Sequence, residues 1–521
     1  MEALKKIVER LNGSGAKTPA DLARIKRETA KRYGIPCPSN RELLKAYHET
    51  TRVKRSLRIE RLLRVRPIRS LSGIVNVSVL TKPYPCPGKC VYCPSEKGAP
   101  KSYLKNEPAV MRAVSNKYDP FKQTEMRLKA LKEGGHPIDK IDLRIIGGTW
   151  SFYPKNYQSW FVKRCFDACN KSFSKNLFIA QKKNEKSCSR IIGISVETRP
   201  DFVTKEEITR LRRLGITGVE LGVQSLFDDV LKINKRGHKV EETILATELL
   251  KNTGFKVCYQ MMPNLPGSDL KKDVKMFKVL FLDQRFRPDW LKIYPTAILK
   301  NSLLHKWWKK GKYEVYTDRQ AIDLIKSIKK IVPYYVRIQR IIRDIPSCSI
   351  AAGPARISNL RQVVGREIKN EKWSCKCIRC REVRSAYESD EKVFLFRKDF
   401  TASNGKEVFL TMEDRKRKRL YSLLRLRKQS KYPVFKILDG AVLIRELHTY
   451  GQLQEIKKER NKNSPQHTGL GKRLMEEAEK IAEKEFKAKK IAVISGIGVR
   501  GYYRKLGYDL RDTYMVKNLD N

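Results

Sequence analysis

Apolar and polar residues alternate with two different periods between residues 66 and 345. Short runs rich in β-branched residues predict strands at 73–80, 141–146, 191–196, 218–222, 256–260, 290–294 and 335–339. Between them, apolar positions repeat with helical spacing and predict helices that include 121–132, 205–214, 241–251 and 270–281. Strands that alternate with helices form βαβ units, so we expect a parallel sheet that closes into a full or partial barrel.

The segments on either side of this region have different patterns. Residues 1–65 are dense in Arg and Lys and show helical periodicity at 18–33 and 39–63, where Ser39 and Glu42 form a capping-box pattern. After residue 393, strands follow one another at 408–412, 420–426 and 441–450, before a helix at 470–484 and a strand at 491–495. We therefore predict a basic helical arm (1–65), a barrel domain (66–345), a linker (346–392) and a separate α+β domain (393–521).

The charge balance narrows the choice of partners. Lys and Arg number 111 against 56 acidic residues, which gives a formal net charge of +55. A Lys-rich proteome usually raises Glu together with Lys, and here the acids do not follow, so a nucleic acid is the favoured partner. The chain has no apolar run long enough to span a bilayer and no secretory signal, so we expect a cytoplasmic protein without membrane contact. Twelve cysteines in such a protein favour metal or cofactor ligation over disulfides.

The first cysteine cluster comes directly after the first expected strand. Cys86, Cys90 and Cys93 lie within eight residues, and the Pro and Gly between them turn the chain so that three thiolates can converge. A tetrahedral zinc ion needs a fourth ligand close by, and none is obvious. A 4Fe–4S cluster held by three cysteines instead leaves one iron open for a small chelating molecule, and we favour this interpretation.

The spacing Cys-x3-Cys-x2-Cys, with an aromatic residue before the last cysteine, resembles the radical SAM family. The resemblance implies that S-adenosylmethionine binds the open iron and is cleaved reductively to a 5′-deoxyadenosyl radical, with an electron donor as partner. Further candidates stand at the expected strand ends, where such a barrel builds its site. They are Gly147, Gly148, Glu197 and Gln224 for cofactor binding and Lys292 for catalysis. Taken singly, each has a structural alternative, such as a turn, an ion pair or a cap.

A second cysteine cluster lies in the expected linker. Cys375, Cys377 and Cys380 offer three thiolates within six residues. A second iron–sulfur site is one explanation, but structural zinc fits better, because the metal would staple a linker that lacks its own core. The fourth ligand is not evident; Cys348 is the first candidate and His305 the second.

A glycine-rich loop precedes the helix expected at 470–484. Glycines that open a helix expose backbone N–H groups, which bind phosphates together with the helix dipole. The order strand, Q-x-x-G-x-G, helix, strand and then GYYRKLGY at 501–508 resembles the GNAT acetyltransferases. The resemblance implies that acetyl-CoA is held by Gln466, His467, Thr468, Gly469, Leu470 and Gly471. Tyr502 or Tyr503 would then protonate the leaving thiolate or position the carbonyl, although either is alternatively a core aromatic residue.

A radical SAM region followed by a GNAT region is a rare pairing in one chain. Together with the segments VETRPD, ELGVQS, NKRGH, IRELHTYG and YMVK, it is similar to the family of Elongator catalytic subunits from about residue 66 onward. The basic N-terminal helices are similar to that family's tRNA-binding arm. The resemblance implies an α/β chain with a partial TIM-like radical SAM barrel, an α+β GNAT domain, a basic helical arm and a zinc-stapled linker.

The reaction that this resemblance implies is the first step of carboxymethyl-type modification of the wobble uridine in the tRNA anticodon. The deoxyadenosyl radical takes a hydrogen from the acetyl methyl of acetyl-CoA, the carbon radical adds to carbon 5 of uracil, and thioester hydrolysis leaves a carboxymethyl group. Carried over by position, His238 and Lys292 face the radical site. Eukaryotic members space the first two cluster cysteines further apart, so this chain resembles the bacterial and archaeal forms. We therefore infer no multi-subunit assembly, and a homodimer stays open.

Three other functions predict different observations. A protein lysine acetyltransferase with a purely structural cluster would acetylate peptides without S-adenosylmethionine. A non-catalytic RNA-binding scaffold would bind tRNA without producing 5′-deoxyadenosine. Another radical RNA modifier, such as a methylthiotransferase, leaves the acetyl-CoA loop unexplained. We therefore expect the anticodon stem-loop of tRNA as substrate, with the wobble base flipped into the barrel mouth.

Overall fold

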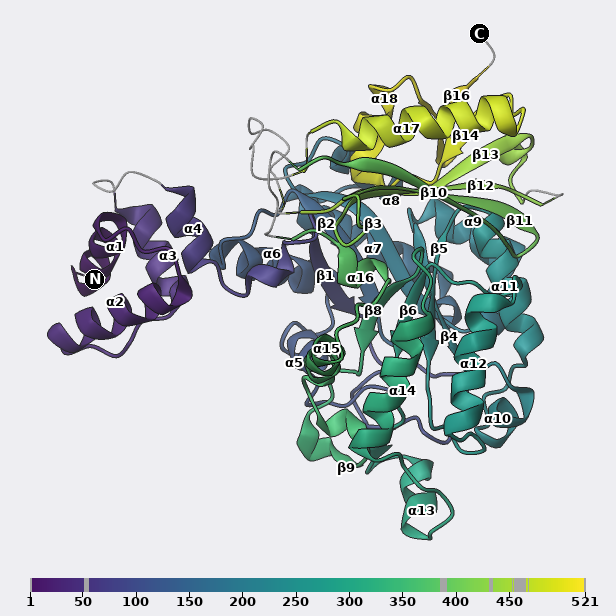
Figure 1. Cartoon of the computed structure of the whole chain (residues 1–521), viewed down its shortest axis with the longest axis horizontal. Helices are drawn as coiled ribbons and strands as arrows, with labels where there is room; N and C mark the ends of the chain where they lie inside the picture. The colour runs from purple at the N-terminus through teal and green to yellow at the C-terminus, as the bar shows by residue number, and fades with distance from the viewer. Residues whose placement is uncertain are drawn as a thin grey trace.

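The computed structural model describes residues 2–50, 56–384, 391–430, 434–451, 453, 465–466 and 468–519. Four helices form an arm that projects from the body of the molecule (Figure 1): α1 (Glu2–Gly13), α2 (Pro19–Arg32), α3 (Asn40–Glu49) and α4 (Leu57–Leu63). The expected capping box of Ser39 and Glu42 is confirmed at the start of α3. The arm has a hydrophobic core of its own, separate from the main core.

The main body contains a seven-stranded parallel sheet whose strands follow one another in chain order. Its strands are β1 (Val75–Leu80), β2 (Lys140–Ile146), β3 (Arg190–Thr198), β4 (Gly218–Gln224), β5 (Lys256–Met261), β6 (Trp290–Ile293) and β8 (Arg337–Ile341). All seven strands predicted from the sequence are confirmed. Because β1 and β8 stand at the two edges, the sheet is an open half-barrel.

Helices cover the outer face of the half-barrel, as the helical spacing predicted. They include α6 (Pro120–Glu133), α7 (Lys155–Asn170), α9 (Lys205–Arg213), α11 (Val240–Asn252), α12 (Leu270–Leu282) and α14 (Asp318–Ile331). Shorter elements lie at the ends of the strands: α5 (Pro108–Ser115), α8 (Leu177–Asn184), α10 (Asp228–Ile233), α13 (Leu303–Lys309), β7 (Ile298–Leu299) and β9 (Ile350–Ala352). No helix in the part of the chain that the structure covers is both long and apolar enough to cross a membrane.

The expected linker is folded against the barrel. It contains α15 (Leu360–Asn370) and α16 (Ile378–Arg381), which are followed by the second sheet. Leu360 and Val364 of α15, together with Cys377 before α16, belong to the main hydrophobic core. This segment therefore shares the core of the barrel, and a metal is not its sole source of order.

The second sheet has seven strands in the order β10-β11-β12-β13-β14-β16-β15. The strands are β10 (Phe394–Ala402), β11 (Gly405–Glu413), β12 (Leu420–Lys428), β13 (Ala441–Thr449), β14 (Lys490–Val493), β15 (Asp509–Arg511) and β16 (Tyr514–Asn518). The helices are α17 (Leu470–Lys480), continued by a π turn at Ile481–Glu485, and α18 (Arg500–Arg504). β13 and β14 are parallel and pair only from Ala441 to Ile444, so the second half of β13 diverges from β14 and leaves a gap between them.

The second sheet lies across the amino-terminal ends of the barrel strands, with α17 on its far side (Figure 1). A cluster of fully buried charges joins the two sheets. Asp289, just before β6, pairs with Arg445 of β13 at 2.5 Å, and Glu407 of β11 accepts from Arg445 and from Arg427 of β12 at 3.0 Å. Lys251 of α11 lies 3.5 Å from Asp289 and 3.7 Å from Glu407. The barrel and the second sheet are therefore one packed body.

Candidate active sites

The first cysteine loop follows β1 at the carboxyl-terminal end of the barrel. Cys86 Sγ lies 3.8 Å from Thr149 Oγ1, which follows β2. Arg236 donates to Cys90 Sγ at 3.4 Å, and Cys93 lines a cavity inside the barrel mouth. A Cβ on Gly88 would lie 3.5 Å from Cys90 Sγ and 3.7 Å from Cys86 Sγ. The sulfurs of Cys86 and Cys90 therefore lie beside a tightly packed turn, and a guanidinium group contacts that of Cys90.

The spacing of these sulfurs distinguishes a single ion from a cluster. Zinc binds sulfur at about 2.3 Å, so thiolates on one zinc ion approach one another to roughly 4 Å. Cys86, Cys90 and Cys93 do not form a group whose sulfurs all lie within 4.8 Å. A 4Fe–4S cube takes each thiolate on a different iron and holds the sulfurs further apart. The residues therefore fit an iron–sulfur cluster with three protein ligands.

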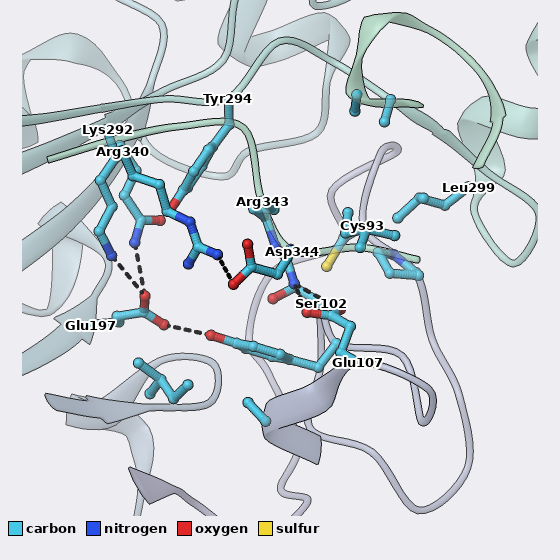
Figure 2. Close-up of a pocket in the computed structure, with 18 of the residues that line it drawn as sticks. Cys93, Ser102, Glu107, Glu197, Lys292, Tyr294, Leu299, Arg340, Arg343 and Asp344 are labelled. Atoms are coloured by element: carbon cyan, nitrogen blue, oxygen red, sulfur yellow. Dashed lines mark hydrogen bonds and ion pairs between the residues drawn. The ribbon is translucent and has the colours of Figure 1, made fainter. Parts of the chain in front are cut away.

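The carboxyl-terminal ends of the strands enclose a cavity of about 280 Å³ beside Cys93 (Figure 2). Glu197 of β3, Gln224 of β4 and Lys292 of β6 line it, as expected from their places at the strand ends. Gly147 and Gly148 follow β2 near the cysteine loop, and both have positive φ. A Cβ on Gly147 would lie 2.2 Å from Thr81 Oγ1, so this position has no room for a side chain.

Glu197 and Lys292 face each other inside this cavity (Figure 2), with Nζ and Oε1 3.5 Å apart. Lys292 also forms a close ion pair with the buried Glu220 of β4. Burial opposes the charged form of Lys292, but Glu220, Tyr294 and Glu197 outweigh it and hold its pKa above the ordinary value. Lys292 is therefore a fixed cation and is unsuited to act as a base at neutral pH.

Gln224 has two unusual features for a residue at a strand end. Its φ is +69°, in the left-handed region that glycine favours, and its Oε1 is buried without a hydrogen-bond partner among the described residues. Strained backbone and an unsatisfied buried acceptor occur together where a ligand is held. Its side chain lines the cavity, which fits the expected binding role.

Sequence reasoning missed several residues of this cavity. Tyr103 donates to Glu197 Oε2 at 3.0 Å, and Gln260 of β5 donates to Glu197 Oε1 at 3.0 Å. Arg343 donates to Glu107 at 2.9 Å near the mouth (Figure 2). Gln260 could have been found from its place at the end of an expected strand, whereas Tyr103 and Arg343 lie in loops without such a signal.

His238 lies behind the cysteine loop and does not line the cavity. Its Nε2 is 3.0 Å from Nε of Arg236, the residue that donates to Cys90. Burial, reinforced by Arg236, lowers the pKa of His238 to about 4. His238 is therefore neutral and accepts from Arg236, so it acts on the loop through that residue.

A second cavity, of about 550 Å³, opens where β13 diverges from β14. Gln466, Gly469, Leu470 and Gly471 line it, together with the barrel residues Gly73, Lys140, Arg190 and Lys256. Gly469 has φ +87° and precedes α17, and no side chain among the described residues caps this helix end. The first N–H groups of a helix lack partners within the helix and are suited to bind an anion. Thr468 donates to Pro465 O at 2.6 Å, and His467 lies outside the described residues.

Tyr502 and Tyr503 both line the second cavity, but in different ways. Tyr502 is 39% exposed, and a Cβ on Gly471 would lie 3.4 Å from its hydroxyl. Tyr503 is buried and packs its ring against Tyr508. Burial raises the pKa of Tyr502 to about 12, so its hydroxyl keeps its proton at neutral pH. Of the two, Tyr502 presents a proton donor to the glycine loop.

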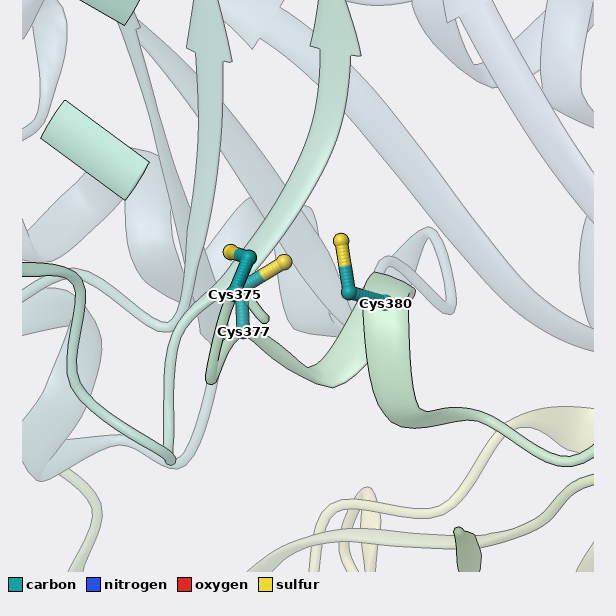
Figure 3. A group of neighbouring side chains, drawn as sticks. All are labelled: Cys375, Cys377 and Cys380. Atoms are coloured by element: carbon teal, nitrogen blue, oxygen red, sulfur yellow. The ribbon is translucent and has the colours of Figure 1, made fainter. Parts of the chain in front are cut away.

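The second cysteine cluster is compact. The sulfurs of Cys375, Cys377 and Cys380 lie within 4.8 Å of one another (Figure 3), which fits a single metal ion. Lys329 Nζ lies 3.3 Å from Cys380 Sγ. The two candidates for a fourth ligand were wrong. Cys348 is exposed and lies 3.8 Å from Asn106 Nδ2, and His305 stacks on Trp308 in α13.

Comparisons with known protein families show which class of enzyme has this architecture. The family model described as "Radical SAM superfamily" matches residues 84–280, and that of the "Radical_SAM C-terminal domain" matches residues 288–370. Together with the half-barrel and its cysteine loop, these matches show that the protein is a radical SAM enzyme. It carries an additional domain built from the second sheet and its helices.

The full-length relatives narrow this class. The tRNA uridine(34) acetyltransferase of Methanocaldococcus infernus is 44% identical over 512 residues, covering 96% of this chain and 95% of that protein. Elongator complex protein 3 of Homo sapiens is 38% identical over 521 residues, covering 96% and 93%. A solved structure of the M. infernus Elp3 with an N-terminal deletion (1–46) is 42% identical with a TM-score of 0.76, covering 86% and 99%. This chain belongs to the family of the tRNA uridine(34) acetyltransferases and Elongator complex protein 3.

Proposed function

We propose that this protein uses S-adenosylmethionine radical chemistry and acetyl-CoA to install a carboxymethyl group on carbon 5 of the wobble uridine of tRNA. The observation that carries this proposal is that one packed body holds two cavities, one beside the first cysteine loop and one beside the glycine loop before α17, and that barrel residues such as Lys140 and Lys256 form a wall of the second. Its relatives are named tRNA uridine(34) acetyltransferases, which supports tRNA and an acetyl donor as substrates.

Cys86, Cys90 and Cys93 would hold a 4Fe–4S cluster, which together with S-adenosylmethionine and an electron donor supplies a 5′-deoxyadenosyl radical. The acetyl methyl of acetyl-CoA loses a hydrogen atom to this radical and adds to carbon 5 of uracil. The adduct radical would then lose the hydrogen on carbon 5 as a proton and return one electron to the oxidised form of the electron donor, so the sequence would consume no net electron. Hydrolysis of the thioester finally releases CoA and leaves the carboxymethyl group.

The residues of the two cavities have separate roles in this scheme. Gly147 and Gly148 would let the methionyl group approach the backbone, Glu197 and Gln224 would hold the polar groups of the cofactor, and Lys292 would orient anionic groups as a fixed cation. The N–H groups after Gly469 would bind the CoA pyrophosphate. Tyr502, protonated at neutral pH, would donate its proton to the leaving thiolate, while Tyr503 supports it from the core.

A route for tRNA is supported by unpaired charge between the arm and the barrel mouth. The guanidinium groups of Arg69, Arg112 and Arg127 form no ion pair or hydrogen bond with any residue for which the structure gives a position. Burial, reinforced by Arg112 and Arg69, lowers the pKa of Arg127 to about 10, so these cations lie close enough to repel one another. Arg112 also lines the first cavity. Phosphates are the partners that would relieve this repulsion.

We further propose zinc at Cys375, Cys377 and Cys380, a cytoplasmic location, and a chain divided into an arm (1–65), a radical SAM domain (66–345), a zinc-binding linker (346–392) and a GNAT domain (393–521). A protein lysine acetyltransferase is a weaker alternative. The acceptor amine of a protein substrate must reach the thioester in the second cavity. The amino-terminal ends of β2, β3 and β5 form one wall of this cavity and would block that approach.

The test uses anaerobically reconstituted protein with S-adenosylmethionine, a reductant, acetyl-CoA and unmodified tRNA. We expect mass spectrometry of the digested tRNA to find carboxymethyluridine at the wobble position, with 5′-deoxyadenosine as co-product. Cys90→Ala should abolish both products and leave tRNA binding nearly intact. Neither product in wild-type protein with a full cluster and bound tRNA would contradict the proposal.

The acetyl-CoA site is tested by Gly469→Trp, whose side chain would enter the space in front of α17. Gly440 is a matched control, because it also has positive φ and a Cβ added there would meet nothing within 4 Å. Gly469→Trp should remove acetyl-CoA turnover while the cluster still assembles, and Gly440→Trp should leave turnover unchanged. Turnover that survives in Gly469→Trp would exclude this loop as the phosphate site.

A further inference from the structure

An open hollow of about 690 Å³ lies on the surface behind the first cysteine loop. Pro87, Gly88 and Lys89 of that loop form one wall, and α10 with the turn that leads into α11 forms the other. Tyr92 and Cys93 of the same loop line the first cavity, and the two spaces share no lining residue. The cysteine loop therefore separates the first cavity from this second space, which we call the rear hollow.

A thin layer of protein separates the rear hollow from the sulfur of Cys90. A Cβ on Gly88 would lie 3.5 Å from Cys90 Sγ. Arg236, which also lines the hollow, donates to the same sulfur at 3.4 Å. Pro87 and Gly237 are exposed in the hollow and have no long side chain that would keep a partner away. Because electron transfer slows steeply with distance, a redox partner seated here would be well placed to reduce a cluster on the loop.

Unpaired positive charge surrounds the rear hollow. Four exposed lysines line it: Lys89, Lys232, Lys235 and Lys239. Their ammonium groups form no ion pair or hydrogen bond with any residue that the structure describes. Solvated lysines without internal partners attract an acidic surface and steer its approach.

The carboxylates of the rear hollow already have partners. Asp229 forms an ion pair with Lys272 at 2.5 Å. Asp228 accepts from the backbone N–H of Val240 at 2.7 Å, and Glu242 accepts from that of Lys239 at 2.8 Å. With Lys272, five lysines stand against these three carboxylates, so the hollow has a surplus of positive charge.

The rear hollow lies away from the route that we propose for tRNA. The arm and α10 are on opposite sides of the barrel (Figure 1). Arg112, which belongs to the tRNA route, lines the first cavity and not the rear hollow. A tRNA that passes from the arm to the barrel mouth therefore leaves these lysines free for another acidic partner.

We propose that the rear hollow is the docking site of the electron donor, a small acidic protein that carries a reduced flavin or iron–sulfur centre. This inference rests on the proposed function, in which Cys86, Cys90 and Cys93 hold a 4Fe–4S cluster. One electron passes from the donor, which is oxidised, to the cluster, which is reduced, and no covalent bond forms or breaks. A contact of this kind is small and short-lived, as in other electron-transfer complexes, so the donor leaves after each transfer.

The first experiment measures binding of two acidic probes, a flavodoxin and a 4Fe–4S ferredoxin, to the reconstituted holoenzyme by calorimetry. Lys232→Glu/Lys239→Glu should raise the Kd by about 10-fold, because the reversed charges repel the probe. Lys182→Glu/Lys183→Glu is the matched control, since it makes the same change in net charge at two exposed positions of α8 and should leave the Kd unchanged. For the wild-type protein, the affinity should fall as salt is added.

A second measurement follows reduction of the cluster by the reduced flavodoxin. The rate should fall by a similar factor in Lys232→Glu/Lys239→Glu only, and reduction by dithionite should be the same in all three proteins, which shows that the cluster is intact. Protein that binds no iron at the cysteine loop would count against the proposed function, whereas binding of the probes would still be measurable.

The docking site itself is overturned by either of two results. One is that neither probe binds the wild-type protein, or that both bind Lys232→Glu/Lys239→Glu as tightly as the wild type. The other is that this variant loses affinity for tRNA in filter binding while its affinity for the probes is unchanged, which would assign the rear hollow to RNA.

Discussion

Lys140 donates a hydrogen bond of 3.1 Å to Oε1 of Gln466, from the first residue of β2 to the loop before α17. The side-chain amide nitrogen of Gln466 in turn donates to the carbonyl oxygens of Gly73 and Thr449, each at 3.1 Å. Both polar atoms of Gln466 are therefore used to fix the glycine loop against the barrel. Its expected contribution to acetyl-CoA binding is indirect, through the position of that loop.

Replacing Gln466 by Leu should weaken both the fold and the loop. Gln466 is buried, and its three partners, one buried and two partly buried, lose their hydrogen bonds, so the free energy of unfolding should fall by about 1–3 kcal/mol. Urea denaturation measures this loss, and calorimetry should show weaker acetyl-CoA binding. The exposed Gln362 offers a control, because Gln362→Leu should change neither quantity. Unchanged stability of Gln466→Leu would contradict the bracing role.

Lys292→Met should destabilise the barrel and stop S-adenosylmethionine cleavage. The change leaves the buried Glu220 without its cation, which costs about 3–5 kcal/mol when one partner of a buried pair is removed. The double variant Lys292→Met/Glu220→Gln should recover part of the stability but not the cleavage. Recovery of both would show that Lys292 serves only to neutralise Glu220.

The titration of Lys251 should make the free energy of unfolding increase with pH on the alkaline side of neutral. Burial lowers its pKa from 10.5 to about 8, although Asp289 and Glu407 oppose the shift. Between these two values the folded chain has lost the proton and the unfolded chain retains it, so stability increases with pH. Lys251→Met removes this cost and should be more stable by about 3 kcal/mol at neutral pH.

The advantage of Lys251→Met should shrink as the pH rises from 8 towards 10.5. Urea denaturation of both proteins at pH 7 and at pH 10 checks this convergence. A wild-type protein that is the more stable of the two at neutral pH would mean that the two carboxylates hold Lys251 better than its depressed pKa indicates.

Arg127→Gln should weaken tRNA binding in a salt-dependent way. If Arg127 neutralises one phosphate, the slope of log K against log salt should become shallower by about 0.7 to 0.9. Filter binding of tRNA at several salt concentrations gives this slope. Arg397 is the matched control, because its guanidinium is already paired with Asp399 and Glu485. An equal change in slope for Arg397→Gln would point to a general effect of net charge.

Cys377→Ser should release zinc and leave iron in place. The buried Cys377 lies in the compact sulfur group, whereas the iron would be held by the loop after β1. Metal analysis of the purified protein measures both elements, and the melting temperature should fall with the loss of zinc. Cys348→Ser is the control and should retain both metals. Zinc that persists in Cys377→Ser would exclude this site.

The barrel could be predicted because its strands have strong apolar runs with helices between them. β10 was missed because most of its residues are exposed, so this edge strand lacks the apolar alternation that marks a buried strand. The three-residue β15 was missed for lack of length, and β16 was missed as well. Ser39–Glu42 was recognised because a capping box is local in sequence.

The same difference between local and distant residues applies to the sites. Cys86, Cys90 and Cys93 are close in sequence, so their pattern can be recognised before the fold is known. Glu197 gains Tyr103 and Gln260 as partners only when a loop and two strands meet. The choice of Cys348 as a zinc ligand was wrong because it stands 27 residues before Cys375 and the fold does not bring its sulfur into the compact group.

The buried ion cluster between the sheets constrains how such a protein can change over generations. Asp289 and Lys251 belong to the barrel by sequence, but their counter-charges come from β11 and β13. A gene fragment for either half alone would encode a protein that exposes charged side chains which are buried and paired in the whole chain. Loss or exchange of one half by recombination would therefore destabilise the other, so the two sheets are expected to be inherited together.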